Sequence, residues 1–183
     1  EDTDWPGNNN GVWRNIGEKI EGNEFSDGRW RFIIFDFDLS MNQPYNRRGS
    51  SSIFDNVANR IERSTLNPFF LALLDNNTDF QHKFVNTYCD YANEIFRPSR
   101  VNQILDRYRE DYPDLIAYSY VRWNTARFNS RLEYFTSSKN NFLRSLDTIA
   151  NFFNNRANYT IQNMRDFIGL KGDLVELTIE IIS

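Results

Sequence analysis

Helical spacing fills most of this chain and constrains its fold more than any other feature. From about Ile53 to Leu170, apolar residues recur three or four positions apart, which is the period of an amphipathic α-helix. Proline, glycine and capping residues divide this run into helix-length segments. The predicted helices begin at Asn67, at Thr78 or Asp79, at Ser99 and at Asp114, and a long pattern from Phe128 to Phe153 precedes a last helix that Gly169 ends.

Strand patterns flank the helical run on both sides. Residues 12–16 and 29–38 alternate or run apolar and aromatic, and NEFSDG between them supplies turn residues, so a β-hairpin is predicted. The second strand, RWRFIIFDFD, carries large apolar residues on both parities, and both faces are expected to be buried near its end. The tail DLVELTIEII, residues 173–182, predicts a strand that either adds to this hairpin or begins a following domain. The fold class is therefore α+β and predominantly helical.

Composition and charge exclude several classes of protein. The 183 residues suit one domain with a real core. The formal net charge of −4 leaves no overall basic field for a nucleic acid or an anionic membrane. One cysteine excludes an intrachain disulfide, and one histidine excludes histidine-rich metal sites and most catalytic triads. No membrane-spanning segment is expected, because no apolar run approaches about 18 residues.

An Asp–Asn pair near the N-terminus carries the clearest chemical pattern. Asp4 is followed five positions later by Asn9, with Pro6 and Gly7 in the turn between them. Kinase catalytic loops use the D-x-x-x-x-N spacing to hold a carboxylate near the acceptor hydroxyl and an amide oxygen on a metal ion. A second metal carboxylate is then needed, and Asp36 stands at the end of the second strand. The alternative is that Asp4 and Asn9 bond their own backbone in a polar turn.

Longer blocks surround this pattern and extend along the chain. They read DWPGNNNGVWR, DGRWRFIIFDFDLSMN, NPFFLALLDNNTDFQHKFVNTYCDYANEIFRPSRV and a later RW at positions 122–123. In content and order these blocks resemble the CotH kinase-like family, named for a spore-coat protein, over residues 4–170. The resemblance implies an atypical protein kinase that transfers phosphate from ATP to Ser or Thr of an extracytoplasmic or spore-coat protein. It also implies a helical bundle like a kinase C-lobe and a secreted or cell-surface location, in some members within carbohydrate-degrading assemblies.

The resemblance also implies roles for individual residues. Asp4 matches the catalytic aspartate, Asn9 the metal ligand of the catalytic loop, and Asp36 the main carboxylate for Mg²⁺. Asn8 is the alternative to Asn9, and Asn8, Asn9 and Asp36 would face the ATP. Asp38 would point to the same side of a regular strand as Asp36, where it either supports a second metal ion or accepts backbone hydrogen bonds.

The family's nucleotide-covering lobe, with its phosphate-binding lysine, lies upstream of the matching region. We therefore expect residues 1–170 to form the C-terminal portion of the kinase domain and residues 171–183 to form a C-terminal strand. Such a portion is expected to bind ATP poorly and to be inactive by itself, because the missing lobe covers the phosphates.

Two other functions compete with the kinase hypothesis. One is a non-catalytic kinase-like binding or scaffold module of a cell-surface assembly, which would not need three convergent polar groups. The other is carbohydrate hydrolysis by Asp4 and Asp36, which leaves Asn9 without a role. A protein kinase with Mg²⁺ and ATP as cofactors and a protein as substrate explains all three residues.

Overall fold

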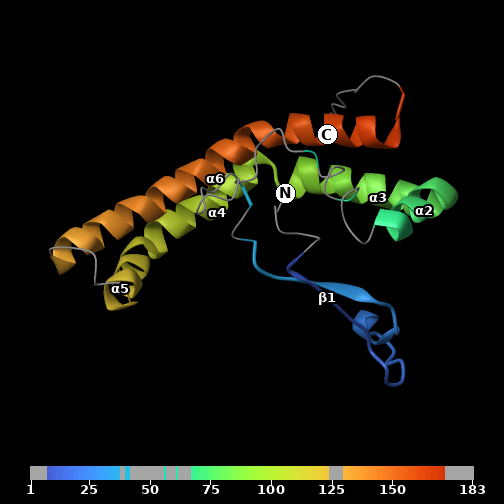
Figure 1. Cartoon of the computed structure of the whole chain (residues 1–183), viewed down its shortest axis with the longest axis horizontal. Helices are drawn as coiled ribbons and strands as arrows, with labels where there is room; N and C mark the ends of the chain where they lie inside the picture. The colour runs from blue at the N-terminus through green and yellow to red at the C-terminus, as the bar shows by residue number, and fades with distance from the viewer. Residues whose placement is uncertain are drawn as a thin grey trace, which may run out of the picture.

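A computed structural model describes residues 8–37, 40–41, 56, 61, 67–123 and 130–171 of the chain. Within these ranges an N-terminal two-stranded hairpin is followed by a series of helices, so the fold is α+β and predominantly helical, as predicted (Figure 1). The strand predicted at residues 173–182 lies outside the described residues.

The hairpin pairs β1 (Asn10–Trp13) with β2 (Arg31–Ile34) in antiparallel register. Both strands are shorter than the sequence predicts, and the connection contains a short 3-10 helix, η1 (Glu24–Ser26). Side chains form hydrogen bonds with the backbone groups of this connection. The amide of Asn15 donates to the carbonyls of Gly17, Glu18 and Ser26. Because these local bonds compete with strand pairing, the ladder ends at Trp13 and Arg31.

The hairpin exposes its apolar side chains on both faces, so the prediction of two buried faces is wrong. Trp30, Phe32 and Phe35 are all about half exposed or more. Figure 1 shows the hairpin extending away from the helices of the described ranges. Apolar residues at both odd and even positions of a strand indicate that both of its faces favour burial. They do not indicate which part of the molecule covers each face.

The helices form an elongated arrangement along one long helix. Helix α6 runs for 38 residues without interruption, so the two predicted helices in this region are one, and Gly169 ends it in the left-handed conformation at φ 68°. Helices α4 and α5 pack along α6, while α2 and α3 lie toward its C-terminal end (Figure 1). The bounds are α2 (Asn67–Asn76), α3 (Thr78–Asp90), the π-helical turn η2 (Tyr91–Ile95), α4 (Pro98–Asp111), α5 (Pro113–Trp123) and α6 (Arg131–Ile168).

The apolar spacing of the helices predicts one shared core that includes Phe80, Phe84, Tyr88, Ile104, Leu105, Leu146, Ile149 and Phe153. In the described helices Leu105, Leu146 and Phe153 are buried, whereas Phe80, Phe84 and Tyr88 are only half buried. The buried cluster belongs to the helices along α6 and includes Leu105, Ala117, Leu146, Phe152, Phe153 and Met164. A half-buried aromatic cluster joins α2 to α3, where Phe70 meets Phe80 and Phe84 edge-on with centroids 5.7 and 5.0 Å away. The rings of α3 therefore pack against α2, the helix that directly precedes α3 in the chain. The apolar spacing in a helical sequence therefore identifies the apolar side of the helix, but it does not identify the element against which that side packs.

Asn77 caps the N-terminus of α3, one residue before the predicted caps Thr78 and Asp79. Its Oδ1 accepts a hydrogen bond from the backbone N–H of Phe80 at 2.9 Å. We expect Asn77→Ala to lower the free energy of unfolding by about 1 kcal/mol, because an N–H of the first turn loses its acceptor. Urea denaturation followed by circular dichroism measures this loss. Asn76→Ala is the matched control, since Asn76 only donates to the Ala72 carbonyl from an exposed position. Equal losses in both variants would refute the cap.

Candidate active site

Asn9 and Asp36 lie together at the open end of the hairpin. Asn9 directly precedes β1, and Asp36 follows the last residue of β2 by two positions. Asn10 and Ile34 form the last pair of the ladder, so Asn9 and Asp36 lie just beyond the point where strand pairing ends. The hairpin thus brings together two residues that are 27 positions apart in the sequence.

A hydrogen bond joins the two residues directly. The Asn9 side-chain Nδ2 donates to the backbone carbonyl of Asp36 at 3.2 Å. Asn9 and Asp36 also both adopt left-handed backbone conformations, with φ of 52° and 57°. Asn and Asp tolerate this region better than most other residues with a side chain. The bond orients the Asn9 amide with its nitrogen toward the Asp36 backbone, which leaves Oδ1 as the amide's acceptor atom.

The structure brings together part of the predicted site. Asn8, the alternative to Asn9, is exposed beside it, and the Asp36 residue is also exposed. Asp4 and Asp38 lie outside the described residues, so their predicted roles stay predictions. Within the described ranges, no group of three or more His, Cys, Asp and Glu side chains is arranged to hold a metal ion.

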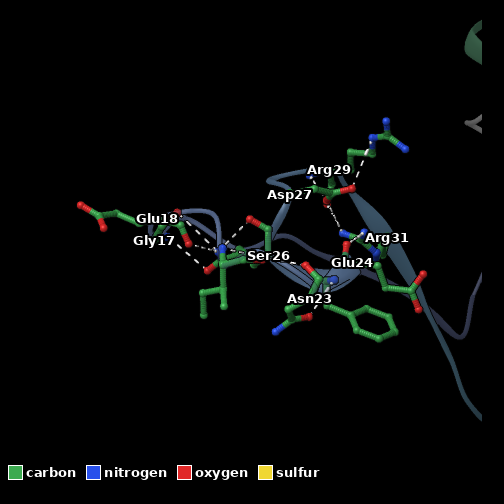
Figure 2. Close-up of polar contacts among 11 residues, drawn as sticks. Gly17, Glu18, Asn23, Glu24, Ser26, Asp27, Arg29 and Arg31 are labelled. Atoms are coloured by element: carbon green, nitrogen blue, oxygen red, sulfur yellow. Dashed lines mark hydrogen bonds and ion pairs between the residues drawn. The ribbon is translucent and has the colours of Figure 1, made fainter.

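An arginine and an aspartate, to which the sequence motifs assign no role, hold the far end of the hairpin. Arg31 Nη1 donates to Asp27 Oδ1 at 2.8 Å, and Asp27 also lies 3.3 Å from the Nε of Arg29 (Figure 2). This hydrogen bond from Arg31 is the main reason that the pKa of Asp27 is lowered. The Arg31 guanidinium also donates to the carbonyl of Glu24. The D-G-R-W-R order was a usable signal, because it places both arginines within reach of one carboxylate.

Aromatic rings complete this support. The Arg31 guanidinium lies 5.7 Å from the Trp13 ring centroid and 5.3 Å from that of Phe25, and these two rings stack on each other. Trp13 belongs to β1 and Arg31 to β2, so the contact links the paired strands. We infer that it secures the register that places Asn9 beside Asp36.

Comparison with known proteins gives the class of protein to which this site belongs. A family model described as CotH kinase protein matches residues 1–160, which is most of the chain. The chain therefore belongs to the CotH kinase family. Neither a curated protein nor a solved structure matches it significantly. At the level of the family, its function is kinase-like, with transferase chemistry and a protein as substrate.

The family also indicates ATP and a divalent metal ion as general cofactors. Among the helices in the described part of the chain, none combines the length and apolar character that crossing a membrane requires.

Proposed function

We propose that the kinase domain to which this chain belongs transfers the γ-phosphoryl group of ATP to Ser or Thr side chains of an extracytoplasmic protein, such as a spore-coat or cell-surface component. The observation that carries this proposal is the contact between Asn9 and Asp36 at the open end of the hairpin. It supports the pairing of a catalytic-loop amide with a strand-end carboxylate that phosphoryl transfer requires.

The donor set of this site fits Mg²⁺. An amide oxygen and a carboxylate are both hard oxygen ligands, and Mg²⁺ in such sites takes one or two carboxylates together with substrate phosphates and water. Asn9 would offer its Oδ1 and Asp36 its carboxylate, with Asn8 as the alternative amide and Asp38 as a ligand of a second ion. When bound, Mg²⁺ supplies charge neutralisation for the β- and γ-phosphates.

The remaining role falls to Asp4 in the same proposal. Its carboxylate would accept a hydrogen bond from the acceptor Ser or Thr hydroxyl and orient that oxygen toward the phosphorus. The hydrogen bond from Asn9 to the Asp36 backbone would keep the amide in one orientation, so that the catalytic loop and the strand end act as one unit.

A non-catalytic binding module is the second candidate, and the exposed aromatic residues of the hairpin favour it. Exposed apolar clusters of this kind mark interaction surfaces in soluble proteins. The two functions differ in whether phosphate is transferred at all.

A labelling experiment distinguishes them. The protein at its natural length is incubated with Mg²⁺ and ATP labelled on the γ-phosphate, with dephosphorylated casein as the probe substrate. The proposal predicts label on phosphoserine or phosphothreonine, in casein or in the protein itself. Absence of label with both Mg²⁺ and Mn²⁺ would favour the binding module, and label on tyrosine alone would refute the acceptor class.

A further inference from the structure

The apolar side chains of the hairpin do not fix the register of β1 against β2. The ladder has four residue pairs, and neighbouring residues of β2 are exposed to similar extents on its two faces, Phe32 to 52% and Ile33 to 46%. Register is weakly specified when neither face of a strand is buried in preference to the other. The connection, residues 14–30, is also much longer than the two-residue turns that set the register of tight hairpins. Another contact is therefore needed to hold the strands in place.

Arg31 makes such a contact at the last pair of the ladder, where it lies opposite Trp13. Its guanidinium donates to Asp27 Oδ1 at 2.8 Å, to the Arg29 carbonyl at 3.1 Å and to the Glu24 carbonyl (Figure 2). It also lies 5.7 Å from the centroid of the Trp13 ring on the other strand. The side chain of Arg31 is only 23% exposed and that of Asp27 only 21%. One side chain thus ties both strands to the connection between them.

A slip of the register would separate Asn9 from Asp36. A slip of two residues, which returns every side chain to its own face, moves one strand about 7 Å along the other. Gly11 or Asn15 would then lie opposite Arg31, without an indole beside the guanidinium. The 3.2 Å hydrogen bond from Asn9 to Asp36 would be broken, and two ligands of one Mg²⁺ can lie at most about 4.2 Å apart. The register that Arg31 favours is therefore the one in which both residues can reach one ion.

We propose that Arg31 is a positioning residue of the metal site, because it fixes the register of the hairpin and through it the distance between Asn9 and Asp36. The binding of a metal ion by these two residues rests on the proposed function, whereas the role of Arg31 in the register does not.

A direct effect of the Arg31 charge on the metal site is expected to be small. Three residues of strand separate Arg31 from Ile34, about 10 Å, and Asp36 lies farther along the chain. Charges separated by more than about 8 Å are largely screened at physiological ionic strength. Asp27 also neutralises the guanidinium where it lies. An effect of Arg31 on metal binding would therefore be transmitted by the hairpin.

Binding of Mn²⁺ in the presence of a non-hydrolysable ATP analogue tests the proposal in the protein at its natural length. Arg31→Met removes the guanidinium and keeps an apolar stem. It should weaken Mn²⁺ binding by about tenfold, although Arg31 does not touch the ion. Arg29→Met is the matched control, because it removes the same charge beside the same Asp27 carboxylate from a side chain that is 80% exposed. Its Mn²⁺ affinity should not change.

A disulfide between the strands shows whether Arg31 acts through the register. Val12 lies opposite Phe32, and directly opposed Cα atoms, about 4.5–5.5 Å apart, are within reach of a disulfide. Val12→Cys and Phe32→Cys are introduced together with Cys89→Ser, which removes the one cysteine of this sequence. In the Arg31→Met variant, oxidation of this pair should restore most of the Mn²⁺ affinity, and reduction should remove the rescue. With Arg31 retained, oxidation should leave the affinity unchanged.

Equal Mn²⁺ affinities of Arg31→Met and Arg29→Met would overturn the proposal, and so would an oxidised disulfide that restores no affinity. If circular dichroism shows that Arg31→Met does not fold, Arg31→Lys replaces it. Arg31→Lys keeps the charge but not the planar guanidinium, and the same loss and rescue are expected.

The rate of disulfide formation separates a failure of this proposal from a failure of the proposed function. If the unmodified protein binds no Mn²⁺, the metal site of the proposed function is refuted. Arg31→Met should still slow formation of the disulfide between Val12→Cys and Phe32→Cys several-fold, because the two positions spend less time opposite each other. An unchanged rate would refute the role of Arg31 in the register.

Discussion

Asp36→Asn is expected to lower the rate of phosphoryl transfer by about a thousandfold, because single groups that stabilise the transferring phosphate contribute about 10²–10⁵ in rate. The substitution keeps the size of the side chain and removes its negative charge. The contact with Asn9 is made by the backbone carbonyl of Asp36, so the variant retains the acceptor that joins the two residues. A loss of rate would therefore report on the carboxylate rather than on the hairpin.

Rates of label transfer to casein measure this effect, with Asp75→Asn as the control. Asp75 is exposed on α2, away from the hairpin in Figure 1, and the same charge is lost there. Asp75→Asn should retain the original rate. A rate in Asp36→Asn within a few-fold of the original would exclude Asp36 from the site. Equal losses in both variants would show that net charge matters and position does not.

Phe153→Ala is expected to lower the free energy of unfolding by about 3–5 kcal/mol. Phe153 is only 8% exposed and meets two rings, Phe96 at 5.4 Å and Phe152 at 5.2 Å between centroids. Because Phe96 follows the turn η2, this contact joins the helical turn to α6, and the cavity left by alanine would loosen both.

Urea denaturation followed at the helical circular dichroism band tests this prediction, with Leu132→Ala on the same helix as the control. Leu132 is 74% exposed, so its truncation should cost well under 1 kcal/mol. Matching midpoints for the two variants would contradict the assignment of the buried cluster. From the apolar spacing of α3 alone, Phe84→Ala would be expected to lower the free energy of unfolding as much as Phe153→Ala. The Phe84 ring is only half buried, so Phe84→Ala should lower it less.

The hairpin and most helices could be predicted from sequence, because local spacing and capping residues specify them. The closeness of Asn9 and Asp36 is expected from the kinase-like spacing of these residues and not from the strand pattern, because the predicted strands at residues 12–16 and 29–38 place Asp36 inside the second strand. In the structure residues 10–13 pair with residues 31–34, which leaves both residues at the open end of the hairpin. The left-handed backbone at these two residues is the local feature that sequence pattern does not specify.

What could not be predicted is how elements meet. Trp30 and Phe32 follow a buried pattern yet are exposed, and Phe80 and Phe84 follow a core stripe yet meet Phe70 locally. Periodicity records which side of an element avoids water, whereas the partner of that side depends on contacts that are distant in sequence.

Binding of Mn²⁺ in the presence of a non-hydrolysable ATP analogue, measured by electron paramagnetic resonance, tests the central claim that Asn9 and Asp36 hold one metal ion together. Asn9→Ala and Asp36→Asn should each weaken Mn²⁺ binding by at least about tenfold. The double variant should lose little more than either single variant, because residues that act on one ion are coupled and their effects do not add. Unchanged Mn²⁺ affinity in either single variant, or losses that add in the double variant, would contradict a shared site.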